Sequence, residues 1–556
     1  MATTKPDDVR KALLQEDFLE DIRTRHGSEQ WVAVYFSSAR TSESNFGFFS
    51  ALIPNDKVGE VLKNHSWDLR IGNGMPGQII SFPRGGEKEK RQYLRYGDDD
   101  GIEPLVIYRE FHHAMGADYL EILEEFRHFH NLFHDAKENK YLRLNSDGDQ
   151  EEVILVTENS VKIRLKELKQ FLAVKEMHLA LYFDSFRYSS QTLEALGLKE
   201  ISEDVRDGLI SYSRSVRVCD SSFNADQKSL SRILGKKLIP GIEKDKVPRW
   251  SDAKAAVQYE SFTIGVDGNG DPVQYSCEPD KLANYFGANP QAPHFLTPVF
   301  FRREVLAKYY ANPKKFSVED GYLRCGGLWG LRMDNNHEKH IMVFLGDLGE
   351  SLSHNEQLYW KAFNIPPDGK MSAVTFKRGF LAEFADPEKP DLLFKMKFEA
   401  FSEAWQTKFG WSLFKPLGAE DAHCYTALRV PLTDDPAELD NQALALAKVL
   451  VDSINEAEVR KQLRAEPANA KGITKLECYL REKGRDDYQS HIGFLRNLYD
   501  LRHGAGHRKG EAYDRAAAAF ELQDYKPGPG FENILKAAIA LLDYLSKVFE
   551  IEPPAA

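Results

Sequence analysis

The sequence changes character at residues 431–436, where Pro431, Pro436 and two aspartates interrupt the apolar pattern. Before this break, alternating apolar runs are mixed with helical patterns, which is typical of a chain that forms both strands and helices. After it, Leu- and Ala-rich segments recur at helical spacing without a strand pattern. The chain is therefore predicted to end in an all-helical region that follows regions of mixed structure.

The length of the chain supports several domains, because its 556 residues exceed the roughly 100–200 residues of an ordinary domain. A stretch rich in Lys, Pro and Asp at 236–255 predicts a further boundary. We therefore expect an α+β, multidomain protein. It would have two N-terminal αβ regions, 1–240 and 256–430, and a helical domain at 437–550.

The apolar periodicity also predicts individual elements. In the two αβ regions, helices are expected at 7–24, 117–135, 161–177, 303–311 and 391–408. Strands are expected there at 31–36, 141–144, 152–156, 178–183, 260–266 and 340–345, the second and third of these forming a hairpin. In the helical domain, helices are expected at 440–461, 472–483, 487–503, 509–522 and 530–549.

The composition limits the environments and the partners that can be expected for this protein. The chain is 42% hydrophobic and 28% charged, as in globular proteins. No apolar run approaches the ~18–20 residues of a membrane span, and the N-terminus lacks the regions of a signal peptide. The five cysteines form no CxxC pair, which disfavours a disulfide framework or a zinc ribbon. These features predict a cytoplasmic protein with no membrane partner, no metal and no cofactor.

A net charge of −12 disfavours binding of duplex nucleic acid over the whole surface, although a local basic patch can still bind RNA. The motifs GxxxxGK[ST], GxGxxG, HExxH and GxSxG are absent. The segment Asp267–Asp271 opens like a calcium loop and has Glu278 at the twelfth position. However, Pro272 occupies the sixth position, where such a loop needs glycine, so a hairpin turn is favoured.

Two further clusters admit a structural or a functional interpretation. One is the histidine cluster His112, His113, His128, His130 and His134. His130 and His134 are four residues apart, so on a helix they would share a face suited to a metal, but ordinary packing is favoured because no acidic or cysteine ligands clearly accompany them. The other is the basic stretch Lys162–Lys169, which predicts a solvated helix face or, alternatively, a surface for nucleic acid or a partner.

The residues with the clearest chemistry lie at 495–510, LRNLYDLRHGAGHRKG. An arginine and a histidine held together can cleave RNA without a metal. The imidazole transfers a proton to or from the ribose 2′-hydroxyl or the leaving oxygen. The guanidinium stabilises the additional negative charge on the phosphorus centre.

This segment resembles the HEPN superfamily, whose motif is R-x(4–6)-H with a polar residue after the arginine and an amphipathic helix to follow. Arg502, His503 and His507 fit that motif, and Tyr513 with the basic tail at 507–510 is similar to HEPN-type C-termini. The resemblance implies a metal-independent endoribonuclease that cleaves RNA by 2′-hydroxyl attack. It implies His507 as general acid and base and Arg502 as phosphate stabiliser. The supporting residues would be Arg496, Asn497, His503, Arg508, Lys509 and Tyr513.

The resemblance also implies partners. HEPN active sites usually form where two copies of the motif face each other, so a homodimer through the helical domain is expected. The first 430 residues loosely resemble the N-terminal regions of bacterial defence proteins of the ApeA kind. They would sense a trigger, such as a phage component or a nucleotide signal, or hold a toxin-like nuclease inactive in abortive infection. The alternative is a non-catalytic sensor or adaptor whose helical domain serves dimerisation.

The R-x(4–6)-H spacing by itself is not specific, because the chain contains five matches: Arg127/His134, Arg332/His337, Arg485/His491, Arg496/His503 and Arg502/His507. The last is preferred for its flanking small residues and basic tail. Arg496/His503 stays open, since the polar Asn497 follows its arginine. Gly504 and Gly506 predict a helix break, so that Arg502 ends one helix, His507 begins the next and both side chains face one point.

Overall fold

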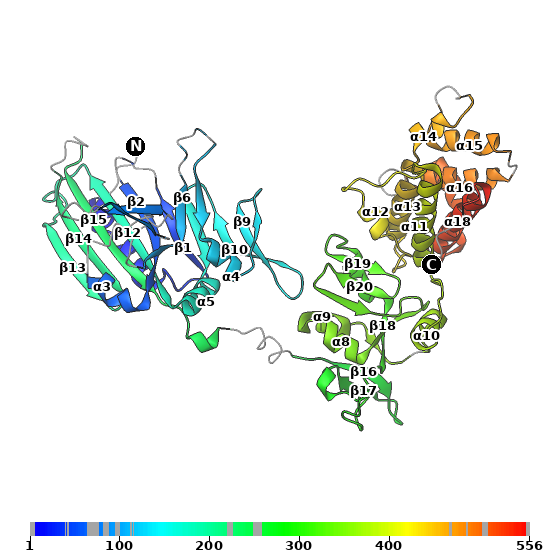
Figure 1. Ribbon diagram of the computed structural model, residues 1–556, viewed down its shortest axis with the longest axis horizontal. Helices are drawn as coiled ribbons and strands as arrows, with labels where there is room; N and C mark the ends of the chain where they lie inside the picture. The colour runs from blue at the N-terminus through cyan, green and yellow to red at the C-terminus, as the bar shows by residue number, and fades with distance from the viewer. Residues whose placement is uncertain are drawn as a thin grey trace. The chain divides into compact units, whose positions relative to one another are not determined.

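The computed structural model describes residues 6–38, 41, 44–63, 77–81, 88–94, 101–109, 111, 114, 116–219, 226–247, 258–367, 369–465, 470–484, 487–502 and 510–551. The chain divides into two compact units. The first unit comprises Met1–Asn145 and Asp149–Ala256, and the second comprises Ser146–Gly148 and Val257–Ala556. Both helices and antiparallel sheets are present, so the protein is α+β and multidomain (Figure 1). None of the helices in the described ranges is long and apolar enough to cross a membrane.

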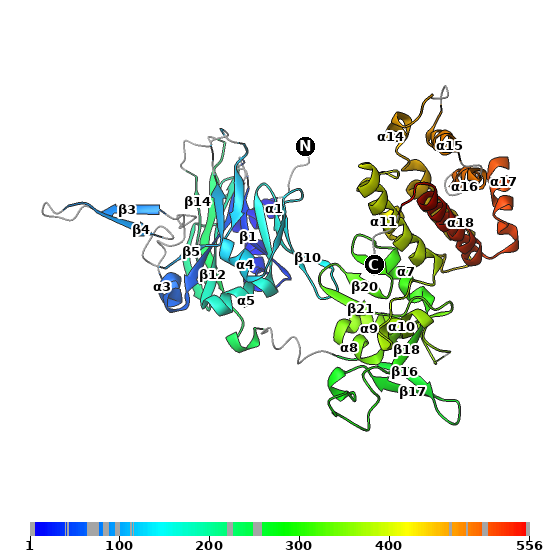
Figure 2. The same cartoon turned by 45° about the vertical axis from the view of Figure 1, so that its right-hand side comes forward.

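A large antiparallel sheet dominates the first unit (Figures 1 and 2). Among the described residues it has eleven strands in the order β13-β14-β15-β12-β2-β1-β11-β10-β9-β8, and β5 pairs with β2 off this path. The strands are β1 Trp31–Ser37, β2 Ser44–Pro54, β5 Glu103–Pro104, β8 Phe133–Asp135, β9 Lys140–Leu144, β10 Gln150–Val156, β11 Ser160–Arg164, β12 Met177–Ser189, β13 Ile201–Asp207, β14 Ile210–Val218 and β15 Ser229–Ile239. Separate hairpins are formed by β3 Gly77–Ser81 with β4 Lys90–Leu94 and by β6 Val106–Arg109 with β7 Tyr119–Ile122. The strand predictions at 31–36 and 178–183 and the hairpin of 141–144 with 152–156 are confirmed.

The central strand β12 is buried on both faces, and its alternating side chains enter two different cores. Leu181 and Phe183 pack with apolar residues of α2 (Glu16–Thr24). Ala180 and Tyr182, on the other face, pack with Val61 of α3 (Val58–Lys63). Helix α5 (Leu165–Lys175) and α4 (Glu124–Phe129) cover a third core beside β1, β10 and β11.

The N-terminal helix predicted at 7–24 is two helices, α1 (Pro6–Leu14) and α2, because the chain turns at Gln15. Gln15 has left-handed backbone angles, with φ 53° and ψ 34°. Its buried amide Nε2 donates to the Ser231 hydroxyl at 2.8 Å, and the Ser185 hydroxyl donates to its Oε1. These buried hydrogen bonds offset the roughly 1–2 kcal/mol of a left-handed non-glycine residue.

The helix predicted at 117–135 is wrong. Those residues form β7, the short helix α4 and β8. Here β7 pairs with β6, and its Leu120 and Ile122 are buried in the core with Phe126. Tertiary pairing and packing of this kind override a local helical pattern. Asn131, with a φ of 49°, follows the end of α4. His130 and His134 therefore do not share a helix face.

The helix predicted at 161–177 is correct only in its second half, since β11 precedes α5. Val161 and Ile163 alternate as buried residues on β11, which lies between β1 and β10. The basic stretch Lys162–Lys169 is thus divided between a strand and a helix. It does not form the single helix face that the sequence suggested.

The mixed part of the second unit, residues 258–367 and 369–381, is built from small antiparallel sheets and short helices. Its strands are β16 Ser261–Val266, β17 Pro272–Ser276, β18 Pro298–Arg302, β19 Phe316–Glu319, β20 Tyr322–Cys325, β21 Trp329–Arg332, β22 His340–Phe344 and β23 Asn364–Ile365. Its helices are α7 Ala307–Tyr310, α8 Leu345–Ser351, α9 His354–Lys361 and α10 Ala373–Phe380, with a 3-10 turn, η5 Arg303–Leu306, before α7. Phe301, Tyr309 and Trp360 are packed together in its core.

The segment Asp267–Asp271 is the turn of the β16–β17 hairpin. The Asp267 carboxylate accepts hydrogen bonds from the backbone N–H groups of Asn269 and Asp271, at 2.8 and 2.9 Å. Pro272 then begins β17. The hairpin predicted here is confirmed, and the Asp267 carboxylate stabilises its turn.

The C-terminal helical part begins earlier than the sequence suggested, with α11 at Pro390. Its helices are α11 Pro390–Phe409, α12 His423–Thr426, α13 Pro436–Ala447, α14 Glu456–Lys461, α15 Gly472–Glu482, α16 Tyr488–Leu501, α17 Glu511–Ala519 and α18 Pro527–Val548, and a π-helical turn, η6 Lys448–Asp452, continues α13. Helices α11 and α18 lie side by side (Figure 2). One core joins them, because Phe394, Phe401 and Trp405 of α11 pack with residues as distant as Ile551. The helix predicted at 391–408 is confirmed, but it packs with the helical part.

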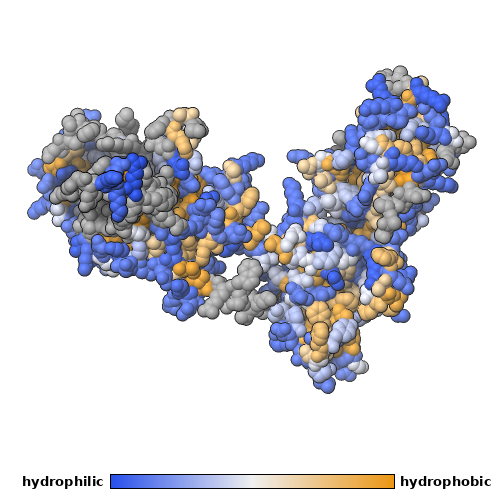
Figure 3. Space-filling view, in the orientation of Figure 1, coloured by the Kyte–Doolittle hydropathy of each residue, from blue (hydrophilic) through white to orange (hydrophobic). Residues whose placement is uncertain are grey.

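Hydrophilic side chains predominate on the face of each unit seen in Figure 3. A local exception lies on and just after α10, where Phe376, Phe380 and Phe384 are exposed. Phe376 and Phe380 stack on each other, with ring centroids 5.7 Å apart.

Candidate functional site

Helix α16 places the first residue of the predicted catalytic pair. Ile492, Leu495, Leu498 and Leu501 are buried at helical spacing, so the helix is anchored along one side in the core. The helix ends at Leu501, and Arg502 is its C-cap residue. The prediction that a helix ends at Arg502 is confirmed.

The Arg502 guanidinium is held by two neighbours. Its carbon Cζ lies 4.1 Å from the centroid of the Tyr499 ring, a cation–π contact within the last turn of α16. Its Nη1 donates to the Asp452 carboxylate. The Arg502 side chain is 22% exposed and that of Asp452 is 44% exposed. The arginine is therefore fixed in orientation while still reached by solvent.

Asp452 owes its position to an irregularity in the preceding helix. Helix α13 continues into the π-helical turn η6, whose last residue is Asp452. A π turn inserts extra backbone into a helix and so changes the direction of the side chains that follow. Val449, Leu450 and Val451 of this turn are buried in the core, which leaves Asp452 at its edge facing α16.

A second ion pair lies beside the first. Lys448, four residues before Asp452, pairs with Asp421, and this hydrogen bond raises the pKa of Lys448. The charge of Asp452 also acts favourably on Lys448. Asp421, Lys448, Asp452 and Arg502 thus form a row of alternating charges at the end of α13. The negative charges largely compensate the local positive charge of Arg502.

Helix α17 brings another residue of the prediction against α13. Tyr513 donates its hydroxyl to the Asp440 carboxylate at 2.7 Å. Asp440 is buried, at 6% exposed. Arg502 and Tyr513, which flank the segment 503–509, are therefore both tied by carboxylates to one continuous helix formed by α13 and η6.

The competing arginine points elsewhere. Arg496 pairs with Glu477 of α15 at 2.6 Å, and its side chain is 53% exposed. Six residues of helix turn the chain by about 600°, which places Arg496 and Arg502 about 120° apart around α16. Asn497 is half-buried. The two arginines cannot serve one phosphate from the same helix, so the two predicted pairs describe two different sites.

The other predicted residues, His503, His507, Arg508 and Lys509, lie outside the described residues, as do Gly504 and Gly506. Helix α17 begins at Glu511, with Gly510 as its N-cap residue. The prediction that His507 begins the next helix falls on a residue outside the described ranges and stays a prediction. The residues on both sides of segment 503–509 are held by hydrogen bonds to carboxylates. They are Arg502 at the end of α16 and Tyr513 in the first turn of α17.

This arrangement suits the recognition of an anion. A guanidinium presents several N–H donors, and Asp452 engages Nη1. A phosphate oxygen that approaches Arg502 meets a group already oriented by the Tyr499 ring. It must also compete with the carboxylate of Asp452. The described residues thus present an oriented guanidinium, which is a group that anions bind, and a carboxylate that competes with an anion for it.

The histidine cluster belongs to the first unit, where its members have separate environments. His128, 74% exposed, pairs with Glu124 at 3.6 Å, and the pKa of His130 is lowered by burial while its Nε2 lies 2.9 Å from the Glu167 carbonyl. His134 stacks on Tyr141. His112 and His113 lie outside the described residues.

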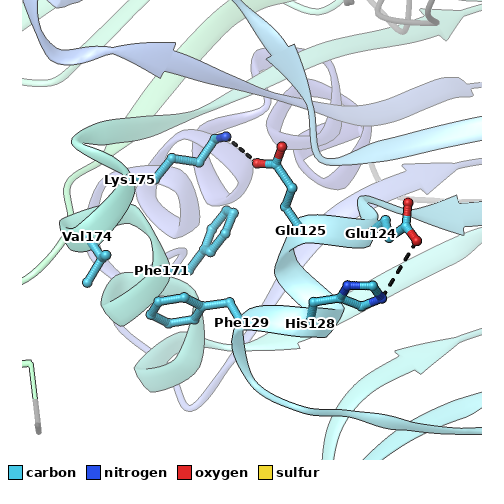
Figure 4. A pocket seen from close by; sticks show the side chains of 7 residues that line it. All are labelled: Glu124, Glu125, His128, Phe129, Phe171, Val174 and Lys175. Carbon is cyan, nitrogen blue, oxygen red and sulfur yellow. Dashed lines mark hydrogen bonds and ion pairs between the residues drawn. The ribbon is translucent and has the colours of Figure 1, made fainter.

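Figure 4 shows the hollow of about 640 Å³ beside His128, between α4 and α5. The rings of Phe129 and Phe171 meet edge to face in it, and Lys175 pairs with Glu125 at 2.5 Å. In the part of the chain that the structure describes, no group of three or more His, Cys, Asp or Glu side chains could hold a metal ion. The histidines that can be placed here are explained by packing and by local ion pairs.

The residues that sequence reasoning missed are Asp452, Tyr499 and Asp440, which contact two predicted site residues. Tyr499 carries a weak signal, since it precedes Arg502 by three residues on one helix. The two aspartates carry none that links them to a motif about 50 to 70 residues further along the chain. No family model, curated protein or solved structure matches this chain.

Proposed function

We propose that the helical part of this protein is a metal-independent endoribonuclease, with Arg502 stabilising the phosphate and His507 transferring protons. The observation that carries the proposal is the oriented, partly exposed guanidinium of Arg502 at the end of α16, directly before the segment that contains His507. RNA supplies its own nucleophile, so an arginine and a histidine suffice for this chemistry.

In the proposed reaction, the imidazole of His507 accepts the proton of a ribose 2′-hydroxyl, and the O2′–P bond forms. The P–O5′ bond breaks, and the leaving O5′ receives a proton from a protonated imidazole. The products are a 2′,3′-cyclic phosphate and a 5′-hydroxyl end. Arg502 stabilises the charge that accumulates on the non-bridging oxygens. No cofactor takes part in these steps.

The proposal extends to assembly and biological role. Two copies of the helical part would face each other as a homodimer, and a monomer would cleave poorly. The regions before residue 430 would sense a signal or restrain the nuclease, as in bacterial antiviral defence. Arg496, Asn497, His503, Arg508, Lys509 and Tyr513 would support RNA binding, with Tyr513 acting through its bond to Asp440.

The test compares the purified protein with its His507→Ala variant on RNA in the presence of EDTA. The wild type is expected to cleave and to leave 2′,3′-cyclic phosphate ends, and the variant is expected to lose at least about 100-fold of the rate. His491→Ala serves as the matched control, because His491 stacks on Tyr544 and lies in another R-x(4–6)-H match. Equal cleavage by wild type and His507→Ala would falsify the assignment. Light scattering measures whether the active species is a dimer.

A second function is favoured by one observation. Since Asp452 compensates the charge of Arg502, the ion pair also suits a purely structural role at the end of α16. On that view the protein is a non-catalytic sensor or adaptor, and the helical part mediates dimerisation. Absence of RNA cleavage by the wild-type dimer, combined with loss of the dimer in Arg502→Ala, would support this function over the first.

A further inference from the structure

A polar hollow of about 670 Å³ lies in the first unit, where α1 passes the ends of β12 and β15. Its lining includes Asp8 and Ala12 of α1, Arg187 and Ser189 of β12, and Gln191 and Gln227. It shares no residue with the candidate site of the helical part.

The strand register explains why the hollow exists. Arg187 is on the same face of β12 as Leu181, Phe183 and Ser185, because side chains alternate along a strand. This face is apolar under α2 and becomes polar towards α1, where Ser185 bonds to Gln15. Its cross-strand neighbours at the level of Arg187 are Ser44 on β2 and Ser231 on β15. Two small side chains flank the arginine and leave room above its side chain.

Arg187 differs from two other arginines of this sheet, which are paired with carboxylates. Arg232 forms two hydrogen bonds of 2.9 Å with Asp184, and Arg214 pairs with Glu203. Arg187 has no carboxylate partner among the described residues, and its Nη1 donates to the backbone carbonyl of Phe186 at 3.1 Å. The side chain is half-buried, and burial lowers the pKa of Arg187. A partly desolvated guanidinium without a counter-charge favours the arrival of an anion.

A second polar group in the hollow is incompletely satisfied. The side-chain oxygen of Gln227 is buried and has no hydrogen-bond partner among the residues that the structure describes. Rotation of this amide by half a turn presents its two N–H donors in place of the oxygen. With Arg187, these donors would surround an oxyanion from two directions. Asp8, exposed at the rim, carries the opposing charge.

We propose that this hollow binds a small molecule through an oxyanion group, a phosphate or a carboxylate, held by the fork of Arg187 and by the amide of Gln227. Arg187 is the anchor because its planar donors match such a group in two contacts. Asp8 weakens the binding of simple anions and would favour ligands that also carry a positive or hydrogen-donating group. This site is independent of the proposed ribonuclease activity.

Hydrogen exchange of the full-length protein tests the proposal, with inorganic phosphate and acetate as separate probes at matched ionic strength in chloride. Phosphate or acetate is expected to slow exchange in peptides covering α1 and residues 185–191, by about threefold when the probe is at about twice its Kd. Arg187→Gln should abolish the slowing, and Asp8→Asn should enhance it. The stronger probe identifies the oxyanion group. Arg217→Gln removes an exposed arginine of β14 and is the matched control.

Exchange in β14 without a probe shows whether Arg187→Gln keeps the native sheet. Arg187→Lys provides a second variant, since it retains the charge but loses the planar fork and should bind at least about threefold more weakly. Absence of slowing by either probe in the wild type would overturn the proposal. Equal slowing in wild type and in a folded Arg187→Gln variant would do the same, because it would show a general salt effect.

Discussion

Arg502, at the end of α16, forms an ion pair with Asp452, the last residue of the π-helical turn that continues α13. The pair joins two segments fifty residues apart in the sequence. It places the arginine that the motif singled out in contact with a residue that no motif includes. The attraction between Asp452 and Arg502 therefore competes with the binding of a phosphate to Arg502.

Neutralising Asp452 should strengthen RNA binding. Asp452→Asn keeps an oxygen acceptor for Arg502 but removes the competing charge, and a partly exposed pair of this kind is worth about 0.2–1 kcal/mol. The expected gain in RNA affinity is therefore about 1.5- to 5-fold. Fluorescence anisotropy with a His507→Ala background, which prevents cleavage, measures it.

Glu477→Gln is the matched control for this experiment, because it releases Arg496 in the same way. It should raise RNA affinity less than Asp452→Asn does, because Arg496 is proposed only as a supporting RNA contact. A gain in Glu477→Gln without one in Asp452→Asn would transfer the role to Arg496.

Removing Arg502 should separate activity from stability. Arg502→Ala is expected to lower the RNA cleavage rate about 10²- to 10³-fold, the effect of losing one oriented charge stabiliser. The free energy of unfolding should fall by no more than about 1 kcal/mol, since the ion pair is partly exposed. Single-turnover kinetics and urea unfolding measure the two effects. In Arg496→Ala the cleavage rate should change less than about threefold; comparable losses in both variants would count against a role specific to Arg502.

Two helical glycines should respond in opposite ways to alanine. At Gly349 of α8, an added Cβ would lie 1.9 Å from the backbone carbonyl oxygen of Cys277, so Gly349→Ala should destabilise by at least about 2 kcal/mol. At Gly493 of α16, nothing lies within 4 Å of the added atom. Gly493→Ala should therefore stabilise by about 0.5–1 kcal/mol, the helix preference for alanine over glycine. Urea unfolding that shows equal effects at both positions would contradict the packing of α8.

Asp347 should make stability depend on pH. Burial raises the pKa of this α8 side chain from 3.8 to about 6, although Arg332 opposes the shift. The folded protein therefore binds a proton more tightly than the unfolded chain does. Stability from this group is present below pH 4, declines as pH rises through the range from about 4 to 6, and stays low above it. Asp347→Asn, which mimics the neutral form, should stabilise at pH 7.5 by roughly 1–3 kcal/mol.

The same substitution should have little effect near pH 3, where Asp347 is largely protonated in both the folded and the unfolded state. Urea unfolding at the two pH values measures the difference. Glu338→Gln, at an exposed position in the same unit, controls for the loss of one negative charge. A stabilisation of Asp347→Asn that did not vary with pH would rule out titration as its cause.

The C-terminal helices were predictable from the sequence because their signals are local. The pattern at 487–503 corresponds to α16 at Tyr488–Leu501, and Gly510 before α17 and Pro527 at the start of α18 mark their beginnings. The helix predicted at 117–135 is wrong because the structure of that segment depends on contacts that are not local. Leu120 and Ile122 lie on β7, which pairs with β6 about a dozen residues earlier and packs in the core. The spacing on one segment does not reveal such pairing.

Only the motif residues of the candidate site could be predicted from the sequence, and their carboxylate partners could not. Arg502 and Tyr513 could be named from the motif and its flank, but Asp452 could not. Its direction depends on the π turn at Lys448–Asp452, and the run KVLVD gives no sign that a regular helix changes its pitch there. Arg187, likewise, is one of many arginines until the register places Ser44 and Ser231 beside it.

The pairing of Asp452 with Arg502 also has a consequence for ionic strength. An unpaired arginine that binds RNA releases about 0.7 of a counterion for each single-stranded phosphate it neutralises. An RNA phosphate that displaces Asp452 exchanges one negative partner for another, and the freed carboxylate gathers cations of its own. Arg502 should then contribute little to the salt dependence of RNA binding. The slope of log K against log salt should become steeper in Asp452→Asn, by up to about 0.7.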